Sequence, residues 1–390
     1  LFYCFFFCFL VCAGSAIPLV PGDNSHYVEG ESRYIWMPDG EGVPHLVDLQ
    51  EPVDEFIRVS TNMMYIYIFR WNPTNPQVIV HGNANTIWSS NYVASRPLKV
   101  IVHGWNSNGN SAINPLVRDA FLAVSDANVI VVDWGALANG LYATAAAGVP
   151  SVGQFLGNFL VWLINTAGGN WNNVHLVGFS LGAHVVGNAG RTAGGWPVRV
   201  TGLDPAGPLW SGSGNAINGN AGTYVECIHT DGGLLGIFNP SGNADFYPNG
   251  GRNPQPGCWL STCSHSRAYE LFAATVHHNH LNGRLCGDIN QAQNNQCTGG
   301  TLLMGNGNLA KRGPLFVLKD LSNDISHYHT AHAKLQLSST NDHGAKSRTD
   351  RQTDIAKLKG FLVDYGTLKS DQWSRPERYR RHELSRLTPS

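Results

Sequence analysis

Short apolar runs alternate with longer segments of helical spacing through the first half of the chain. Five runs rich in β-branched residues predict buried strands, and three segments between them predict amphipathic helices. Strands that alternate with helices predict a parallel α/β sheet with right-handed crossovers. The predicted strands are Met63–Phe69, Leu98–Val102, Val129–Val132, Val174–Val177 and Val198–Leu203, and the predicted helices are Asn114–Ser125, Val152–Asn165 and Gly182–Arg191.

The first residues have the pattern of a secretory signal peptide. Residues 1–11 are almost all apolar, and small residues follow as far as Ala16. An apolar run of about 7–15 residues that ends in small residues is typical of such a signal, whereas a bilayer span takes about 20 residues. Because no later run approaches that length, we predict a signal peptide at 1–16 and a secreted, extracellular protein without a transmembrane segment. A buried N-terminal strand is the alternative.

Polar composition marks both ends of the remaining chain. Residues 17–60 are polar and rich in proline and glycine, which predicts a surface arm with little regular structure. Residues 341–390 are rich in charge and net basic, whereas the whole chain is only 14% charged. We therefore predict one domain at 17–320 and a polar, partly basic, disordered tail at 321–390. A basic arm on a membrane surface is the alternative for this tail.

Charge and cysteine content limit the classes of partner and cofactor. A net charge of −1 gives no reason to expect a nucleic acid partner. Five cysteines follow the predicted signal peptide, so two disulfides and one free thiol are the simplest arrangement, and their spacing alone leaves the pairing open. No two cysteines are separated by only two residues, which disfavours a zinc site. The five are Cys227, Cys258, Cys263, Cys286 and Cys297.

Residues 178–182, Gly-Phe-Ser-Leu-Gly, are the strongest sign of chemistry in the chain. A predicted strand runs into them and a predicted helix follows, which is the setting of a nucleophile elbow. A serine hydroxyl becomes a nucleophile when a strained turn exposes it and a neighbouring base removes its proton. We therefore predict that Ser180 is the nucleophile, with an ordinary glycine–serine turn as the alternative.

An acid and a histidine should follow the serine along the chain. Asp204 comes directly after the fifth predicted strand, which predicts that it is the acid, with a turn-capping aspartate as the alternative. The residues alone leave two histidines open. His265 lies just after Cys263 in a polar loop ahead of an apolar helical stretch, and it is favoured over His229, whose strand-like surroundings are typical of a core residue.

Two backbone N–H groups are candidates for an oxyanion hole. One belongs to the residue after the nucleophile, Leu181. The other belongs to the loop after the strand Leu98–Val102, where Trp105 follows a His-Gly pair. For Trp105, a plain core position is the alternative.

Together these segments resemble the pancreatic lipase family. The resemblance implies an α/β-hydrolase fold, with a mostly parallel central sheet flanked by helices, and hydrolysis of lipid esters at a micelle or membrane surface. It also implies a triad of Ser180, Asp204 and His265, with Trp105 and Leu181 as oxyanion donors. The matching segments are His103–Trp105, Gly178–His184, Gly202–Pro208, Ile228–Asp231, Asp245–Gly251 and Cys263–Ala268, and Arg33–Asp39 is similar to insect neutral lipases.

The resemblance leaves the substrate open. It favours a triacylglycerol or galactolipid lipase acting through an acyl-enzyme, with phospholipase A1 as the alternative. Some members of the family are yolk proteins that have lost the serine, so a non-catalytic lipid-binding or storage protein is the alternative from another class. This chain keeps every catalytic position, which favours the enzyme.

The cysteines depart from the family pattern. In the family a lid lies between two disulfide-bonded cysteines, the second just ahead of the catalytic histidine. Here Cys263 has only Cys258 nearby, and that pair encloses four residues, too few to cover a lipid-sized groove. We therefore expect an open, nearly lidless site with little activation at an oil–water interface. Cys286 and Cys297 are then expected to form the second disulfide, which leaves Cys227 unpaired.

The family's calcium site is a second departure. It lies between the Asp-Pro-Ala and Ile-His-Thr motifs, where residues 207–223 of this chain contain no Asp or Glu. Calcium takes carboxylate oxygens, so we expect no structural calcium, no other metal and no cofactor. The polar residues after the domain also predict that no complete C-terminal β-sandwich, common in the family, is present.

Overall fold

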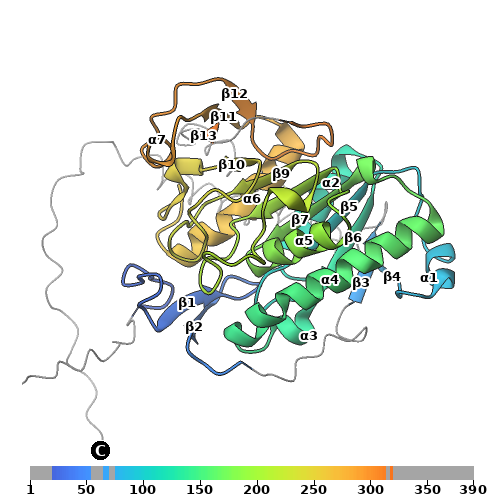
Figure 1. Ribbon diagram of the computed structural model, residues 1–390, viewed down its shortest axis with the longest axis horizontal. Coiled ribbons are helices and arrows are strands. Elements are labelled where there is room, and N and C mark those ends of the chain that lie inside the picture. Colours follow the sequence, from blue (N-terminus) through green and yellow to red (C-terminus); the bar gives the residue numbers. More distant parts are fainter. Residues whose placement is uncertain (1–19, 54–64, 70–74, 313–316, 319–390) are drawn as a thin grey trace, which may run out of the picture. The chain divides into compact units, whose positions relative to one another are not determined.

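An 11-stranded sheet crosses the described part of the protein, which comprises residues 20–53, 65–69, 75–312 and 317–318 of a computed structural model (Figure 1). Neighbouring strands from β13 to β6 are parallel, and the pairs at both edges are antiparallel. In spatial order the strands are β12 (Thr301–Leu303), β11 (Asn282–Leu285), β13 (Val317–Leu318), β10 (Ala244–Phe246), β9 (Val225–Ile228), β8 (Arg199–Leu203), β7 (Val174–Phe179), β5 (Leu98–Val102), β6 (Asn128–Asp133), β3 (Tyr65–Phe69) and β4 (Gln77–Val78).

The helices cover both faces of this sheet. α4 (Tyr142–Ala167) and α5 (Leu181–Thr192) pack on one face, and α2 (Ile113–Val124) and α6 (Ser261–His278) pack on the other. A strand that is covered on both faces has a continuous apolar sequence. The central strands could therefore be predicted from the sequence. The predicted mostly parallel α/β-hydrolase arrangement is confirmed. The shorter helices are α1 (Ala84–Trp88), α3 (Gly135–Ala138) and α7 (Ile289–Gln293), with 3-10 turns at Trp171–Asn173, Gly219–Ala221 and Pro248–Gly251.

The longest helix, α4, extends well beyond the predicted segment Val152–Asn165. Its first half is rich in alanine and contains Pro150, so the apolar periodicity that predicts a helix is weak there. α4 has the length and apolar composition of a membrane span, but 56% of its most apolar window is buried inside the protein. A Cβ on Gly153 would lie 2.8 Å from the Val185 carbonyl oxygen of α5, so the two helices are in close contact. This packing is that of a core helix.

The N-terminal arm contains more regular structure than the sequence predicted. β1 (Tyr34–Pro38) and β2 (Pro44–Asp48) form an antiparallel hairpin, so the expectation of little regular structure is wrong here. The Asp39 carboxylate accepts hydrogen bonds from two backbone N–H groups of the turn, each at 2.9 Å. Each strand has only five residues, and the arm around them is rich in polar residues, proline and glycine, so the sequence did not reveal the hairpin. The predicted signal peptide at 1–16 and the predicted tail at 321–390 lie outside the described residues.

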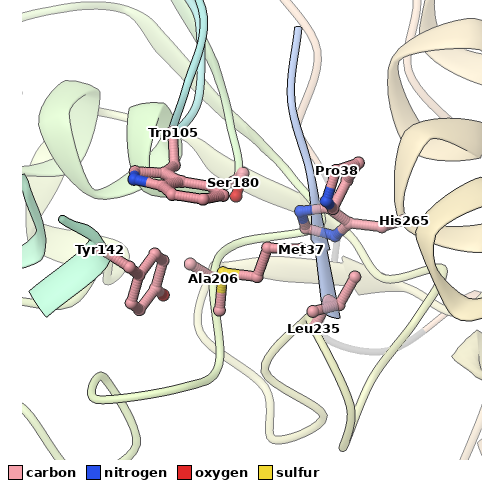
Figure 2. A pocket seen from close by; sticks show the side chains of 8 residues that line it. All are labelled: Met37, Pro38, Trp105, Tyr142, Ser180, Ala206, Leu235 and His265. Atoms are coloured by element: carbon pink, nitrogen blue, oxygen red, sulfur yellow. The ribbon is translucent and has the colours of Figure 1, made fainter. Parts of the chain in front are cut away.

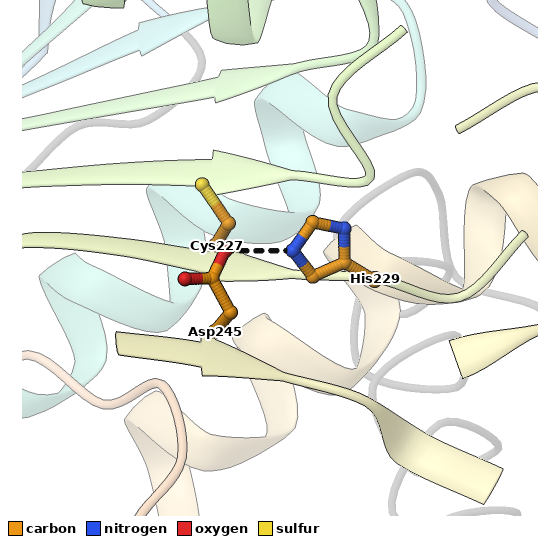
Figure 3. A group of neighbouring side chains, drawn as sticks. All are labelled: Cys227, His229 and Asp245. Carbon is orange, nitrogen blue, oxygen red and sulfur yellow. Dashed lines mark hydrogen bonds and ion pairs between the residues drawn. The ribbon is translucent and has the colours of Figure 1, made fainter. Parts of the chain in front are cut away.

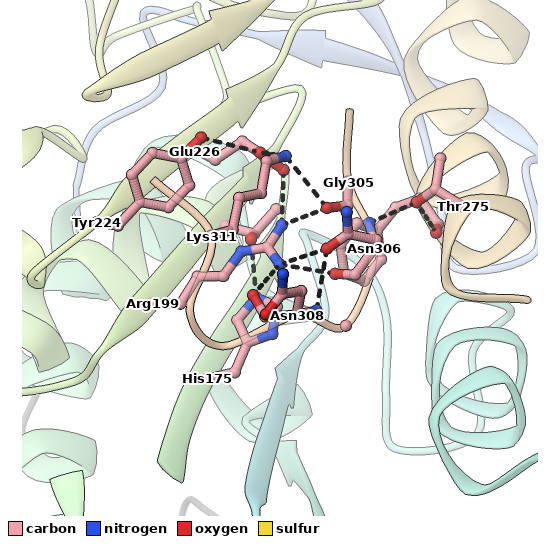
Figure 4. Close-up of polar contacts among 12 residues, drawn as sticks. His175, Arg199, Tyr224, Glu226, Thr275, Gly305, Asn306, Asn308 and Lys311 are labelled. Carbon is pink, nitrogen blue, oxygen red and sulfur yellow. Dashed lines mark hydrogen bonds and ion pairs between the residues drawn. The ribbon is translucent and has the colours of Figure 1, made fainter. Parts of the chain in front are cut away.

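A buried cluster of charges attaches residues 305–311 to the start of β8 and β9 (Figure 4). Arg199, which is fully buried, donates to Glu226 Oε1 at 3.0 Å and to the Gly305 carbonyl at 2.6 Å. Lys311 donates to the other Glu226 oxygen. These bonds hold residues 305–311 against the sheet, at the end of β8 opposite to Asp204.

This cluster holds more positive than negative charge. Lys99, which donates to the Gly307 carbonyl at 3.1 Å, adds a third cation, and its charge interacts with that of Arg199. Burial, followed by the charge of Arg199, lowers the pKa of Lys99 to about 7. Burial also lowers the pKa of Lys311 to about 8 despite the neighbouring carboxylate. Glu226 is the carboxylate that pairs with two of these cations, Arg199 and Lys311.

We predict opposite stability effects for Glu226→Gln and Lys99→Met. Glu226→Gln leaves the cations uncompensated and should lower the free energy of unfolding by about 3–5 kcal/mol, or roughly 2–4 °C in Tm per kcal/mol. Lys99→Met removes an excess cation, so Tm should stay unchanged or rise. The gain should be larger near about pH 7 than near about pH 9, because a lysine with a lowered pKa opposes folding more as the pH falls toward that value. Thermal unfolding followed by circular dichroism measures both effects, and equal losses in the two variants would contradict the charge argument.

Candidate active site

Ser180 lies on a strained turn between β7 and α5. Its backbone has φ 57° and ψ −124°, a conformation that side-chain-bearing residues rarely adopt. A Cβ on Gly178 would lie 2.1 Å from the Gly182 carbonyl oxygen, and a Cβ on Gly182 would lie 2.4 Å from the His103 carbonyl oxygen. Both glycines are therefore required by close backbone contacts, as expected for a nucleophile elbow.

Asp204 follows the end of β8 and is fully buried. Its Oδ1 accepts hydrogen bonds from the backbone N–H of Thr230 at 2.7 Å and of Asp231 at 3.1 Å. Its Oδ2 accepts a hydrogen bond from His265 Nδ1 at 2.6 Å. Because both oxygens are bound, the carboxylate has a fixed orientation toward the imidazole.

His265 lies in the second turn of α6, and the prediction that it belongs to a loop is wrong. The polar residues Ser261–Ser264 disguised the start of this helix, since they carry no apolar periodicity. The Phe179 ring packs against the imidazole, with 4.6 Å between ring centroids. With Nδ1 bound to Asp204, the second ring nitrogen, Nε2, is left for the pocket that His265 shares with Ser180.

His229, the other candidate for the catalytic base, lies in surroundings typical of a structural residue. It is fully buried, with Nδ1 2.7 Å from the Ile237 carbonyl and Nε2 2.9 Å from Asp245 Oδ1. Burial alone would lower the pKa of His229, but the hydrogen bond to Asp245 and its charge outweigh burial and raise this pKa. His229 therefore holds the chain next to Thr230, whose N–H binds Asp204.

Cys227, His229 and Asp245 form a buried group whose donor atoms all lie within 4.8 Å of one another (Figure 3). The imidazole and carboxylate already bond each other, and Asp245 also accepts from the N–H groups of Ser241 and Gly242. Burial, followed by the charge of Asp245, raises the pKa of the Cys227 thiol, whereas a metal ligand must be a thiolate. These residues do not fit a metal site and instead join β9 to β10.

The loop that carries Trp105 contacts the proposed nucleophile directly. A Cβ on Gly104 would lie 2.9 Å from the Ser180 Cβ, so this loop approaches closely only because residue 104 is glycine. Within the described residues, neither the Trp105 N–H nor the Leu181 N–H donates a hydrogen bond. Both predicted oxyanion donors are therefore available beside Ser180, although their role stays a prediction.

Ser180 and His265 line one small pocket (Figure 2). Its volume is about 10 Å³, close to the space that one water molecule needs. Ser180 is 8% exposed and His265 is 2% exposed. Within the described chain the Ser180 hydroxyl makes no hydrogen bond, so its contact with the imidazole remains a proposal. The sequence did not identify the other lining residues, which are Met37, Pro38, Tyr142, Ala206 and Leu235.

Both expected disulfides are present, and Cys227 is the free, buried cysteine. Cys258 and Cys263 enclose a four-residue loop just ahead of His265, and Trp259 on this loop is 85% exposed. The loop is too short to cover the site, as predicted. The site is nevertheless narrower than the expected open one, because the N-terminal hairpin supplies Met37 and Pro38 as one of its walls.

The loop after β8 does not fit the calcium ion that the family resemblance implies. Its backbone carbonyls at Asn215 and Ala216 accept hydrogen bonds from the Arg191 guanidinium at 3.0 Å each. The Asn188 side chain also donates to the Asn215 carbonyl, at 2.8 Å. With a guanidinium on these oxygens and no carboxylate among residues 207–223, the loop offers no calcium site.

We predict that chelators do not affect this protein. Because side chains of α5 hold the loop after β8, EDTA should change Tm by less than about 1 °C, whereas loss of a tightly bound ion would lower it further. Thermal unfolding with EDTA and with added calcium measures this. A drop in Tm that calcium reverses would show that the loop binds the ion.

Comparisons with known proteins place these observations in a family. Pancreatic triacylglycerol lipase of Myocastor coypus is 31% identical over 63% of this chain and 60% of that protein. Hepatic triacylglycerol lipase of Oryctolagus cuniculus is 36% identical, over 58% of this chain and 51% of that protein. Phospholipase A1 member A of Rattus norvegicus is 37% identical, over 49% of this chain and 44% of that protein. The chain thus spans about half the length of the curated relatives it matches.

The lipase family model matches residues 49–306, which include each predicted triad and oxyanion residue. The resemblance to the pancreatic lipase family is therefore confirmed, and this chain belongs to the lipase family.

Proposed function

We propose that this protein is a secreted serine ester hydrolase that cleaves fatty-acyl esters of glycerolipids through an acyl-enzyme on Ser180. One observation carries the proposal. Ser180 lies on a strained elbow and shares a pocket with His265, whose Nδ1 is 2.6 Å from Asp204. A nucleophile, a base and a carboxylate that orients the base are the groups that acyl transfer needs.

In the proposed reaction, His265 Nε2 takes the proton of the Ser180 hydroxyl as its oxygen attacks the ester carbonyl. The backbone N–H groups of Trp105 and Leu181 stabilise the oxyanion, and the positive end of α5 adds to this. His265 then gives the proton to the leaving alcohol, and the acyl group stays on Ser180. Water, activated by the same imidazole, releases the fatty acid and restores the hydroxyl.

Asp204 carries the negative charge that stabilises the imidazolium. Its neighbour Asp231 is also buried, and burial followed by the charge of Asp204 raises the pKa of Asp231 well above its usual range. The N–H groups of Thr230 and Asp231 both donate to Asp204 Oδ1, whereas Asp231 Oδ2 accepts from the Ser261 hydroxyl and from the Leu235 N–H. Of the two carboxyls, only Asp204 bonds the imidazole.

The apolar pocket walls and the names of the relatives support lipid substrates at a micelle or membrane surface. Hydrolysis of triacylglycerol or galactolipid is the first candidate activity, because two of the compared relatives are named triacylglycerol lipases. Phospholipase A1 activity is the second candidate, favoured by the four-residue disulfide loop and by the third relative. Two disulfides support an extracellular location.

A non-catalytic lipid-binding or storage protein is the alternative from another class. Such a protein has no need of a strained serine, and strain persists only where the surrounding structure maintains it. Here Gly178 and Gly182 maintain it by close backbone contacts, which favours catalysis.

Ser180→Ala and His265→Gln should each lower kcat for p-nitrophenyl acetate by at least about 10⁴-fold, because members of a triad act as one unit. Ser213→Ala in the loop after β8 is the matched control and should keep full turnover. Initial rates on the purified protein measure this, and circular dichroism checks that each variant is folded. Turnover in Ser180→Ala equal to the wild type would end the enzymatic proposal. Parallel assays on emulsified triacylglycerol, phosphatidylcholine and galactolipid then identify the substrate class.

Activity should show no jump at an oil–water interface. The disulfide loop encloses only four residues, and the hairpin wall is held by hydrogen bonds, so no large segment needs to open. Rates on tributyrin should follow one smooth saturation curve across its solubility limit. An increase of more than about tenfold on crossing that limit would indicate a moving lid.

A further inference from the structure

The β1–β2 hairpin passes the catalytic pocket and is attached on both sides of it. Residues 22–48 are called the strap below. The buried Asn24 side chain donates to the Ser261 hydroxyl at 3.1 Å and to the Trp36 carbonyl at 2.8 Å, and it accepts from the Trp36 N–H at 2.8 Å. Ser261 begins α6, the helix that carries His265. These bonds attach the strap to the histidine side of the pocket.

The other attachment is to the loop that carries Trp105. The Gly40 N–H donates to the Asn106 carbonyl at 3.0 Å, and the Gly40 carbonyl accepts from the Ala112 N–H at 3.2 Å. A Cβ on Gly40 would lie 2.0 Å from the Ser111 hydroxyl oxygen, so only glycine permits this contact. The strap is thus held to the oxyanion side of the pocket as well.

Between these attachments, Met37 and Pro38 form part of the pocket wall. Figure 2 shows their side chains from the strap beside Ser180 and His265. Met37 is 5% exposed, and the space left in the pocket is about 10 Å³. That space holds about one water molecule, so an acyl chain enters only if a side chain moves.

The Met37 side chain is better able to move than the aromatic residues of the wall. The Trp105 indole and the Tyr142 hydroxyl each donate a 2.9 Å hydrogen bond to a backbone carbonyl. The strap backbone is held by its two attachments and by its hairpin pairing. The Met37 side chain is unbranched, and methionine has three rotatable bonds and no strong hydrogen-bonding group.

The geometry points to Met37 as the residue that limits which acyl groups reach Ser180, with the strap as its fixed support. This inference rests on the proposed ester hydrolysis. Met37 and Ser180 line the same small pocket, so the first carbons of an acyl chain bound to the serine are expected to meet the Met37 side chain. Its size therefore sets the preference for acyl length, and a smaller residue admits longer chains.

The test is the ratio of kcat/KM for p-nitrophenyl octanoate to that for the acetate. Met37→Ala should raise this ratio about tenfold, and Met37→Phe should lower it, since one or two methylenes in an apolar pocket change kcat/KM by that order. Met304→Ala is the matched control. Met304 is also buried, at 4% exposed, but it belongs to the core that contains α2 and α6, so this variant should lose stability without changing the ratio.

A second pair of variants tests the strap without replacing any residue that lines the pocket. Gly40→Ala forces the strap away from Ser111 and should raise the ratio in the same direction as Met37→Ala. Gly300→Ala is its control, because a Cβ there meets no atom within 4 Å. If Met37→Ala fails to fold, Met37→Phe and Gly40→Ala decide the question.

The outcomes separate the two proposals. Ser180-dependent hydrolysis with an unchanged ratio in the Met37 and Gly40 variants would overturn the strap inference alone. Hydrolysis that does not depend on Ser180 in the wild type would overturn the proposed function, and the inference with it. A ratio that shifts in opposite directions for alanine and phenylalanine at position 37, and stays constant in both controls, supports the inference.

Discussion

The hydrogen bond between His265 Nδ1 and Asp204 Oδ2 is the contact on which the proposed chemistry depends. It joins residues 61 positions apart and brings together the end of β8 and the second turn of α6. Asp204 can hold the imidazole only because two backbone N–H groups occupy its other oxygen. Those N–H groups are positioned in turn by the buried His229–Asp245 pair next to them. A wholly structural histidine thus orients the proposed catalytic one.

Strand β8 separates this chemistry from a large part of the fold's electrostatic stability. Arg199 begins the strand and Asp204 follows its end, and both are buried charges. The carboxylate is compensated by two backbone N–H groups and by the His265 imidazole. Arg199 is compensated by Glu226 and by backbone carbonyls of the segment that wraps the sheet. Because the ends are a whole strand apart, the bonds that hold Arg199 and the bonds that hold Asp204 share no residue.

The parts of the fold and site that the sequence predicted are those with local causes. A strand buried on both faces leaves an apolar run, and the elbow leaves glycines two residues on each side of Ser180, because a Cβ there would meet backbone atoms. Local sequence could not decide between His265 and His229, because the answer depends on which imidazole the fold brings to Asp204. The first half of α4 was missed because alanine, glycine and Pro150 carry no apolar period. The signal peptide and the tail stay predictions.

The contacts of the strap could not be predicted from the sequence, because they join segments that lie far apart along the chain. Under the proposed function, these contacts account for selectivity in a site without a large lid. Met37 lines the pocket that contains Ser180 because Asn24 and Gly40 attach the strap to elements that lie far along the chain. A moving lid gives access and selectivity by the same conformational change, and its opening costs free energy in every cycle. A fixed strap separates the two: the backbone keeps the pocket preorganised, and one flexible side chain adjusts to the acyl group. Under the proposed function, such a site would trade adaptability to bulky lipids for a catalytic geometry that needs no interface to assemble.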